Sequence, residues 1–142
     1  MDSVQALLNK KGCEVWTIQP DETVLDGIRQ MAGKNVGSLV VVEDGKPVGI
    51  FTERHYAREI LLKGRNSPTT PIREIMNARF VFAEPEQTIE ECMVVMTNEA
   101  VRHLPVLDRG ELVGIISIGD LVKSKIADQE NIIEKLTQYI HG

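Results

Sequence analysis

A hydroxyl residue and an acid lie three positions apart where the apolar segment GIISIGD (residues 114–120) ends. At a helix start, the Ser117 hydroxyl and the free backbone N–H groups suit a phosphate. The Asp120 carboxylate can accept two hydrogen bonds from a vicinal diol. The same spacing is also an ordinary capping box, which only closes the first turn of a helix. The motif therefore predicts either a site for a phosphorylated sugar or a local helix start.

The pattern occurs a second time, 65 residues earlier, with its last residue changed. In GIFTERH (residues 49–55), Thr52 has the place of Ser117, and His55 has the place of Asp120. A neutral imidazole offers one donor and one acceptor, whereas a carboxylate accepts both hydrogen bonds of a diol. We predict one site that binds a ribose and one altered site.

Other residues with suitable chemistry are ambiguous when taken singly. Arg102 and His103 precede an apolar run and could reach a phosphate, but they also fit a surface charge and a satisfied core histidine. The three histidines lack metal-ligand spacing, and there is no Walker loop, GxGxxG or Ser/His/Asp order. The sequence predicts neither a metal site nor an enzyme.

These residues belong to a unit that the chain contains twice. A shift of 65 residues aligns the halves without a gap, so that Thr23 meets Thr88 and Val48-Gly49-Ile50 meets Val113-Gly114-Ile115. An offset of this length suits a duplicated supersecondary unit.

Each copy predicts the order β-α-β-β-α. Apolar segments at 13–18 and 78–83 predict first strands, and T-x-x-D/E capping boxes at Thr23 and Thr88 begin helices. Two strand-like runs follow in each copy, joined by Asp44-Gly45 or Arg109-Gly110, and then a second helix. We expect an α/β (α+β) fold in which two repeats are related by a pseudo-twofold axis and their sheets pack together.

The expected segments are an N-terminal helix (1–12), repeat 1 (13–64), a linker (65–77), repeat 2 (78–127) and a C-terminal helical extension (128–142). An apolar stripe runs along the last helix and predicts a homodimer; it consists of Val122, Ile126, Ile133, Leu136 and Ile140.

Composition limits the partners. The net charge of −5 argues against a nucleic-acid surface, although local arginines can still bind a small anion. No apolar run reaches membrane-spanning length, and the N-terminus lacks a signal-peptide core. We expect a cytoplasmic protein without a membrane or nucleic-acid partner.

The motifs VGIFTER, VGIISIGDL and VRHLPVLDRGELVGI resemble a tandem cystathionine β-synthase (CBS) domain pair, or Bateman module, of the small stand-alone bacterial type. The resemblance covers residues 14–126. It implies two clefts between the sheets of the repeats, adenosine-containing ligands in those clefts, and dimers.

The resemblance also implies roles for residues in each cleft. In one cleft, Ser117 would bind phosphate and Asp120 the ribose hydroxyls, and the other contributors would be Arg102 and His103 at the phosphates, Trp16 and Thr17 at the adenine edge, and Val36, Gly37, Ser38 and Ile115 in the lining. The mirrored cleft would use Thr52 and Arg54, with Phe80 and Val81 near the base and His55 where the family has Asp.

The expected function is a non-catalytic regulatory module. It would bind AMP, ADP, ATP or NAD between the repeats and signal to an effector protein by a change of conformation. S-adenosylmethionine stays open as well, because all these ligands share adenosine. The alternative is a scaffold or interaction protein with no ligand-dependent role, and a small hydrolase or transferase is disfavoured by the missing nucleophile.

Overall fold

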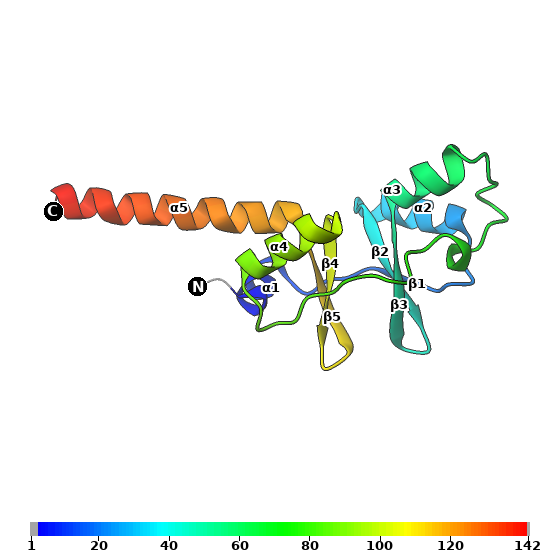
Figure 1. Ribbon diagram of the computed structural model, residues 1–142, viewed down its shortest axis with the longest axis horizontal. Coiled ribbons are helices and arrows are strands. Elements are labelled where there is room, and N and C mark those ends of the chain that lie inside the picture. The colour runs from blue at the N-terminus through cyan, green and yellow to red at the C-terminus, as the bar shows by residue number, and fades with distance from the viewer. Residues whose placement is uncertain (1–2, 142) are drawn as a thin grey trace.

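The computed structural model describes residues 3–141, with side chains up to residue 138, and contains two repeats placed side by side (Figure 1). The terminal residues 1, 2 and 142 of the predicted N- and C-terminal segments lie outside this description. In repeat 1, β1 (Thr17–Ile18) runs parallel to β2 (Ser38–Glu43), and β3 (Lys46–Thr52) completes the sheet antiparallel to β2.

Repeat 2 has a smaller sheet than predicted. Its strands β4 (His103–Asp108) and β5 (Glu111–Ser117) pair antiparallel, and the predicted strand over 78–83 is wrong except for one parallel bridge from Ala83 to Val106. The reason is that the chain just before this segment runs across to repeat 1, where Asn77 pairs with Ile50. The predicted strand over 13–18 is likewise shortened to β1.

The local signals for helices and turns are confirmed. Helices α2 (Val24–Lys34) and α4 (Ile89–Glu99) begin with complete capping boxes, in which Thr23 and Thr88 are the cap residues. In the hairpin turns, Asp44 and Arg109 both have a φ angle of 53°, and the glycine that follows each of them also has a positive φ angle. Two consecutive positive φ angles match the twist of an antiparallel hairpin.

Each repeat completes its core with a segment from beyond its predicted bounds. Helix α1 (Val4–Lys11) packs on repeat 2, where Leu8 lies against Gly114; a Cβ on Gly114 would come 2.8 Å from Leu8 Cδ2. In the predicted linker, the short 3₁₀-helix Ile72–Glu74 packs on repeat 1, and Met76 lies against Gly49 in the same way. The two glycines are therefore needed for close approach.

The second helices of the repeats differ most. In repeat 1, α3 (Glu53–Tyr56) continues into a π-helical turn, Ala57–Leu61. In repeat 2, α5 (Ile118–His141) is a 24-residue helix that projects away from the body of the molecule (Figure 1).

The apolar stripe on α5 is exposed in the single chain. Its described members are Val122, Ile126, Ile133 and Leu136, and the exposed Ile132 lies beside them, whereas the side chain of Ile140 lies outside the description. None of the helices within residues 3–141 combines the length and apolar character needed to cross a membrane.

Candidate ligand-binding clefts

Two cavities lie where the repeats meet, and each contains one copy of the repeated motif. The first, here called the Asp120 cleft, has a volume of about 400 Å³ and is lined by Lys11, Gly12, Glu14, Trp16, Asn35, Val36, Gly37, Ser38, His103, Ile115, Ile116, Ser117 and Asp120. The second, the His55 cleft, has a volume of about 250 Å³ and is lined by Gly37, Ile50, Thr52, Glu53, Arg54, His55, Asn77, Ala100, Val101, Arg102 and His103.

The two clefts are built from equivalent positions. The repeat offset that relates Thr52 to Ser117 also relates other lining pairs, namely His55 and Asp120, Ile50 and Ile115, Val101 and Val36, Ala100 and Asn35, and Asn77 and Gly12. Both clefts include Gly37 and His103, so they adjoin at that point. Strands β3 and β5, which lead into the two motifs, contact each other across the interface.

The Ser117 and Asp120 pair forms a complete capping box at the start of α5. The Asp120 N–H donates to Ser117 Oγ at 3.1 Å, and the Ser117 N–H donates to Asp120 Oδ2 at 2.8 Å. The capping role predicted as the simpler alternative is therefore present. Because Ser117 and Asp120 also line the cavity, the capping role and a ligand-binding role are compatible.

A lysine that sequence reasoning missed reaches the same carboxylate. Lys11 Nζ donates to Asp120 Oδ2 at 2.7 Å and to the Ile115 carbonyl oxygen at 2.8 Å. Burial raises the pKa of Asp120, but the hydrogen bonds from Lys11 and the Ser117 N–H outweigh it and hold the pKa below its usual value. Asp120 is thus a charged acceptor at neutral pH.

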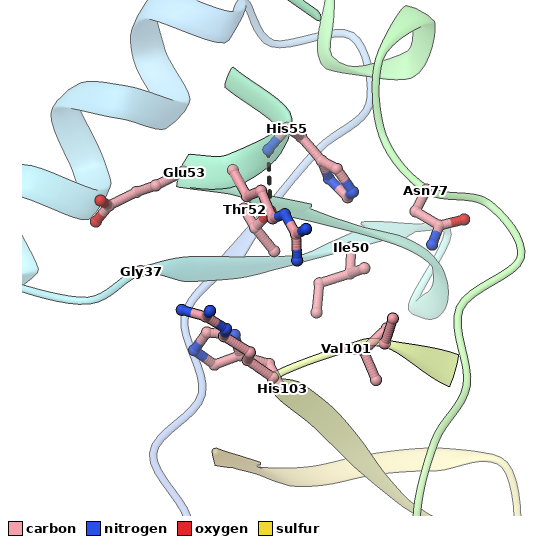
Figure 2. A pocket seen from close by; sticks show the side chains of 11 residues that line it. Gly37, Ile50, Thr52, Glu53, His55, Asn77, Val101 and His103 are labelled. Atoms are coloured by element: carbon pink, nitrogen blue, oxygen red, sulfur yellow. Dashed lines mark hydrogen bonds between the residues drawn. The ribbon is translucent and has the colours of Figure 1, made fainter. Parts of the chain in front are cut away.

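The His55 cleft has the same helix start but a different last residue. The His55 N–H donates to Thr52 Oγ1 at 3.2 Å, the contact drawn as a dashed line in Figure 2. The ring atom His55 Nδ1 is buried and has no hydrogen-bond partner within the described residues. Burial lowers the pKa of His55, against the opposing charge of Glu59, so the imidazole is neutral at pH 7.

Arg102 and His103, both predicted to reach the phosphates beside Asp120, do not line the same cavities. Arg102 lines the His55 cleft, whereas His103 lines both clefts. Arg102 lies in the bend just before β4, and His103 is the first residue of that strand. Burial lowers the pKa of His103, and the charge of Asp120 opposes that effect.

The other predicted lining residues are brought together only in part. Trp16, Val36, Gly37, Ser38 and Ile115 line the Asp120 cleft, and Thr52 and Arg54 line the His55 cleft. Lys34 Nζ lies 4.3 Å from the centroid of the Trp16 ring.

Three predicted residues, Thr17, Phe80 and Val81, line neither cleft. The Thr17 carbonyl accepts a hydrogen bond from Gln30 Nε2 at 3.1 Å, and Val81 packs against the core of repeat 2. Applying the repeat offset to Val36 and its neighbours would have found the missed residues Ala100 and Val101. No comparable local signal marks Lys11.

The residues that line the two clefts provide groups suited to holding a ligand. The Asp120 cleft combines a carboxylate, a helix start and apolar surface, and the His55 cleft contains two arginines and two histidines. Within residues 3–141, there is no group of three or more His, Cys, Asp or Glu side chains placed to hold a metal ion.

Comparisons with known proteins agree with the repeated architecture. A sequence profile of the CBS domain matches residues 7–62 and again residues 72–126. The mitochondrial CBS domain-containing protein CBSX3 of Arabidopsis thaliana is 36% identical over 127 residues, which are 86% of this chain and 62% of that protein. The chain therefore spans less than two thirds of the length of this relative.

Solved structures show the same fold. A CBS-domain protein of Burkholderia ambifaria, named as a candidate signal-transduction protein, is 48% identical, with a TM-score of 0.86 over 89% of this chain and 96% of that one. The CBS domain pair of protein MJ0100, solved with 5′-methylthioadenosine and S-adenosyl-L-methionine, is 21% identical, with a TM-score of 0.81 over 90% of this chain and 98% of that one.

Proposed function

The chain belongs to the CBS-domain family, and from this we propose that it is a non-catalytic regulatory module that binds an adenosine-containing nucleotide between its two repeats. The main support is the Asp120 cleft. A charged carboxylate, the N-terminus of α5 and an apolar surface with Trp16 and Val36 surround one cavity there. Adenosine phosphates need these three environments for ribose, phosphate and base.

The proposed pose follows from the chemistry of each part. Asp120 accepts hydrogen bonds from the ribose hydroxyls, the start of α5 and Ser117 face the first phosphate, and the base lies toward Trp16. Further phosphates point to His103 and, beyond it, to Arg102. AMP, ADP, ATP and NAD all carry this common part. The binding of adenosine compounds by the MJ0100 domain pair supports the class of ligand.

Binding in this position would act on the relation between the repeats. The Asp120 cleft takes residues from both repeats, because Val36 and Ser38 come from repeat 1, and Ser117 and Asp120 from repeat 2. A ligand that binds one relative orientation more tightly shifts the population toward it by its differential affinity. An effector protein would then recognise the favoured orientation.

We also propose a homodimer that covers the exposed stripe on α5. Five large apolar side chains on this helix, from Val122 to Leu136, are between 43% and 62% exposed, which is unfavourable for an isolated chain. Light scattering should give about twice the 15.9 kDa mass of the chain. A monomer at tens of micromolar would contradict this part of the proposal.

Calorimetry tests the ligand class. AMP, ATP or NAD should bind more tightly than the matching guanosine and cytidine compounds, because in the proposed pose the base lies against the cleft surface that includes Trp16 and Val36. Chromatography of the incubated nucleotide should show no product. Equal affinity for all bases, or steady hydrolysis by pure protein, would refute the proposal.

The alternative function is a CBS-pair scaffold or interaction protein without a ligand-dependent role. His55 in the position of the acid and Lys11 on the remaining acid favour it. Mass spectrometry of small molecules released from natively purified protein distinguishes the two functions, because a scaffold would release no adenosine compound.

A further inference from the structure

The ion pair between Lys11 and Asp120 occupies the group that the proposed ligand needs. Asp120 Oδ2 already accepts two hydrogen bonds, from Lys11 Nζ at 2.7 Å and from the Ser117 N–H at 2.8 Å. Within residues 3–141, Asp120 Oδ1 has no such partner. A vicinal diol binds a carboxylate best through both oxygens. Lys11 and a ribose therefore compete for Oδ2.

The pair also forms a wall of the cleft. Lys11 and Asp120 line the Asp120 cleft, and they line a second cavity of about 300 Å³ between α1 and α5, which Lys10 and Lys123 also border. Movement of Lys11 alone would remove one of the two hydrogen bonds on Oδ2 and open this wall. Its side chain is 29% exposed and that of Asp120 is 22% exposed, so water reaches the pair.

The His55 cleft lacks this device. The repeat offset puts Met76 in the position of Lys11, and the neighbouring Asn77 bonds through its backbone to both the carbonyl and the N–H of Ile50, at 2.9 and 3.1 Å. In the Asp120 cleft, the equivalent carbonyl of Ile115 is held by the Lys11 side chain instead, at 2.8 Å. A main-chain bridge is fixed by the fold, whereas a lysine side chain can rotate away.

We propose, on the basis of the proposed function, that Lys11 is a latch that competes with the ribose diol for Asp120 and so sets the affinity of the cleft for ribose-containing ligands. A partly exposed ion pair contributes little, roughly 0.2–1 kcal/mol, which corresponds to about a 1.5-fold to fivefold change in affinity. A ligand can therefore displace Lys11 readily. The latch acts on ligands that have the diol and leaves other ligands unaffected.

The test compares AMP with 2′,3′-dideoxy-AMP, which lacks both hydroxyls, by calorimetry. The parent protein is measured beside Lys11→Met, which introduces the residue type of the equivalent position, Met76. Lys10→Met is the matched control, because it removes the same charge from the same helix and Lys10 forms no ion pair in the described part of the chain. Lys11→Met should bind AMP about 1.5-fold to fivefold more tightly and leave dideoxy-AMP unchanged, and Lys10→Met should change neither.

Each other outcome has a definite meaning. If Lys11→Met weakens the binding of both compounds, Lys11 attracts the ligand phosphate and the latch is refuted. Equal affinities in the parent and Lys11→Met refute it as well. If AMP binds neither protein, the latch is refuted and the binding of ATP or NAD still decides the proposed function, whereas AMP binding to Lys11→Met alone supports both. Lys11→Gln, neutral and similar in length, replaces Lys11→Met if circular dichroism shows that the latter does not fold.

Discussion

The Asp120 cleft and the His55 cleft share a backbone and differ in their side chains. Both have an isoleucine before the helix start, a hydroxyl cap residue, and a valine after a helix that ends in a left-handed residue, Asn35 or Ala100. Their charged groups are different. The Asp120 cleft balances Lys11 and Asp120 as an ion pair, whereas the His55 cleft has Arg54 and Arg102 beside the exposed Glu53.

This difference indicates that the two copies kept the same backbone arrangement around the cleft, while the charged side chains that line it changed. A carboxylate suits the hydroxyls of a ribose, whereas guanidinium groups and imidazoles suit phosphate. We therefore expect the Asp120 cleft to hold the nucleoside and the His55 cleft to contact phosphates. His103 lines both clefts, so it lies where the expected nucleoside site adjoins the expected phosphate site.

The largest expected effect is that of Asp120→Ala. Losing a charged hydrogen-bond acceptor costs roughly 1.5–3 kcal/mol, which should weaken the tight binding of AMP or ATP by about tenfold to a hundredfold. Calorimetry measures this loss. Asp120 also caps α5, and Asp26→Ala is the matched control because Asp26 closes the capping box of α2 away from either cleft. Parent-like nucleotide binding by Asp120→Ala would mean that the clefts are assigned the wrong way round.

Variants of His55 test whether the second cleft contributes to the tight binding event. His55→Ala should leave the tight binding nearly intact, because Asp120 lies in the other cleft. His55→Asp restores the missing acceptor and should strengthen mononucleotide binding at the second cleft by about tenfold or more. Titration to saturation then counts two AMP molecules per chain. Strong loss of the tight event in His55→Ala would show that the two sites are not distinct.

Arg102→Ala should weaken the binding of phosphate groups without changing the binding of the nucleoside. Arg102 is exposed and lies in the His55 cleft, so its attraction to a phosphate is screened and worth roughly 0.2–1 kcal/mol. We expect about a twofold to fivefold loss of affinity for ATP and almost none for adenosine. Binding measured at two salt concentrations should show the ATP effect shrinking as salt increases. An equal loss for both ligands would place Arg102 at the base or sugar instead.

The smallest effect concerns the pH dependence of stability without ligand. Burial lowers the native pKa of both His55 and His103 below the unfolded value of 6.5. The unfolded chain then binds more protons, so the free energy of unfolding decreases as pH falls through 6.5 toward the native pKa values. The lowered pKa of Asp120 acts in the same direction but at lower pH, because stability from this group is lost only as the pH falls below its usual value of 3.8.

Urea unfolding at pH 7.5 and pH 5.5 measures this dependence. The free energy of unfolding should drop less in His55→Ala than in the parent, because one of the two half-buried histidines is gone. An increase in stability on acidification would contradict the assignment of His55 as a half-buried, neutral side chain.

Several features followed from the sequence alone because the interactions behind them span only a few residues. A capping box joins residues three apart, as in Thr23 with Asp26, and a tight turn needs only two residues with positive φ. The repeat itself is visible as a constant offset. The pairs Ser117–Asp120 and Thr52–His55 were therefore predictable, and so was the β-α-β-β-α order apart from the first strand of repeat 2.

The tertiary structure alone decided which distant groups meet. Lys11 reaches Asp120 across 109 positions, because α1 packs on repeat 2 through Val4 and Leu8, a choice that no short motif encodes. The pairing of Asn77 with Ile50 kept most of 78–83 from joining the sheet of repeat 2. Such contacts depend on which segments bury their apolar surface against each core, and this burial is decided only when the whole chain folds.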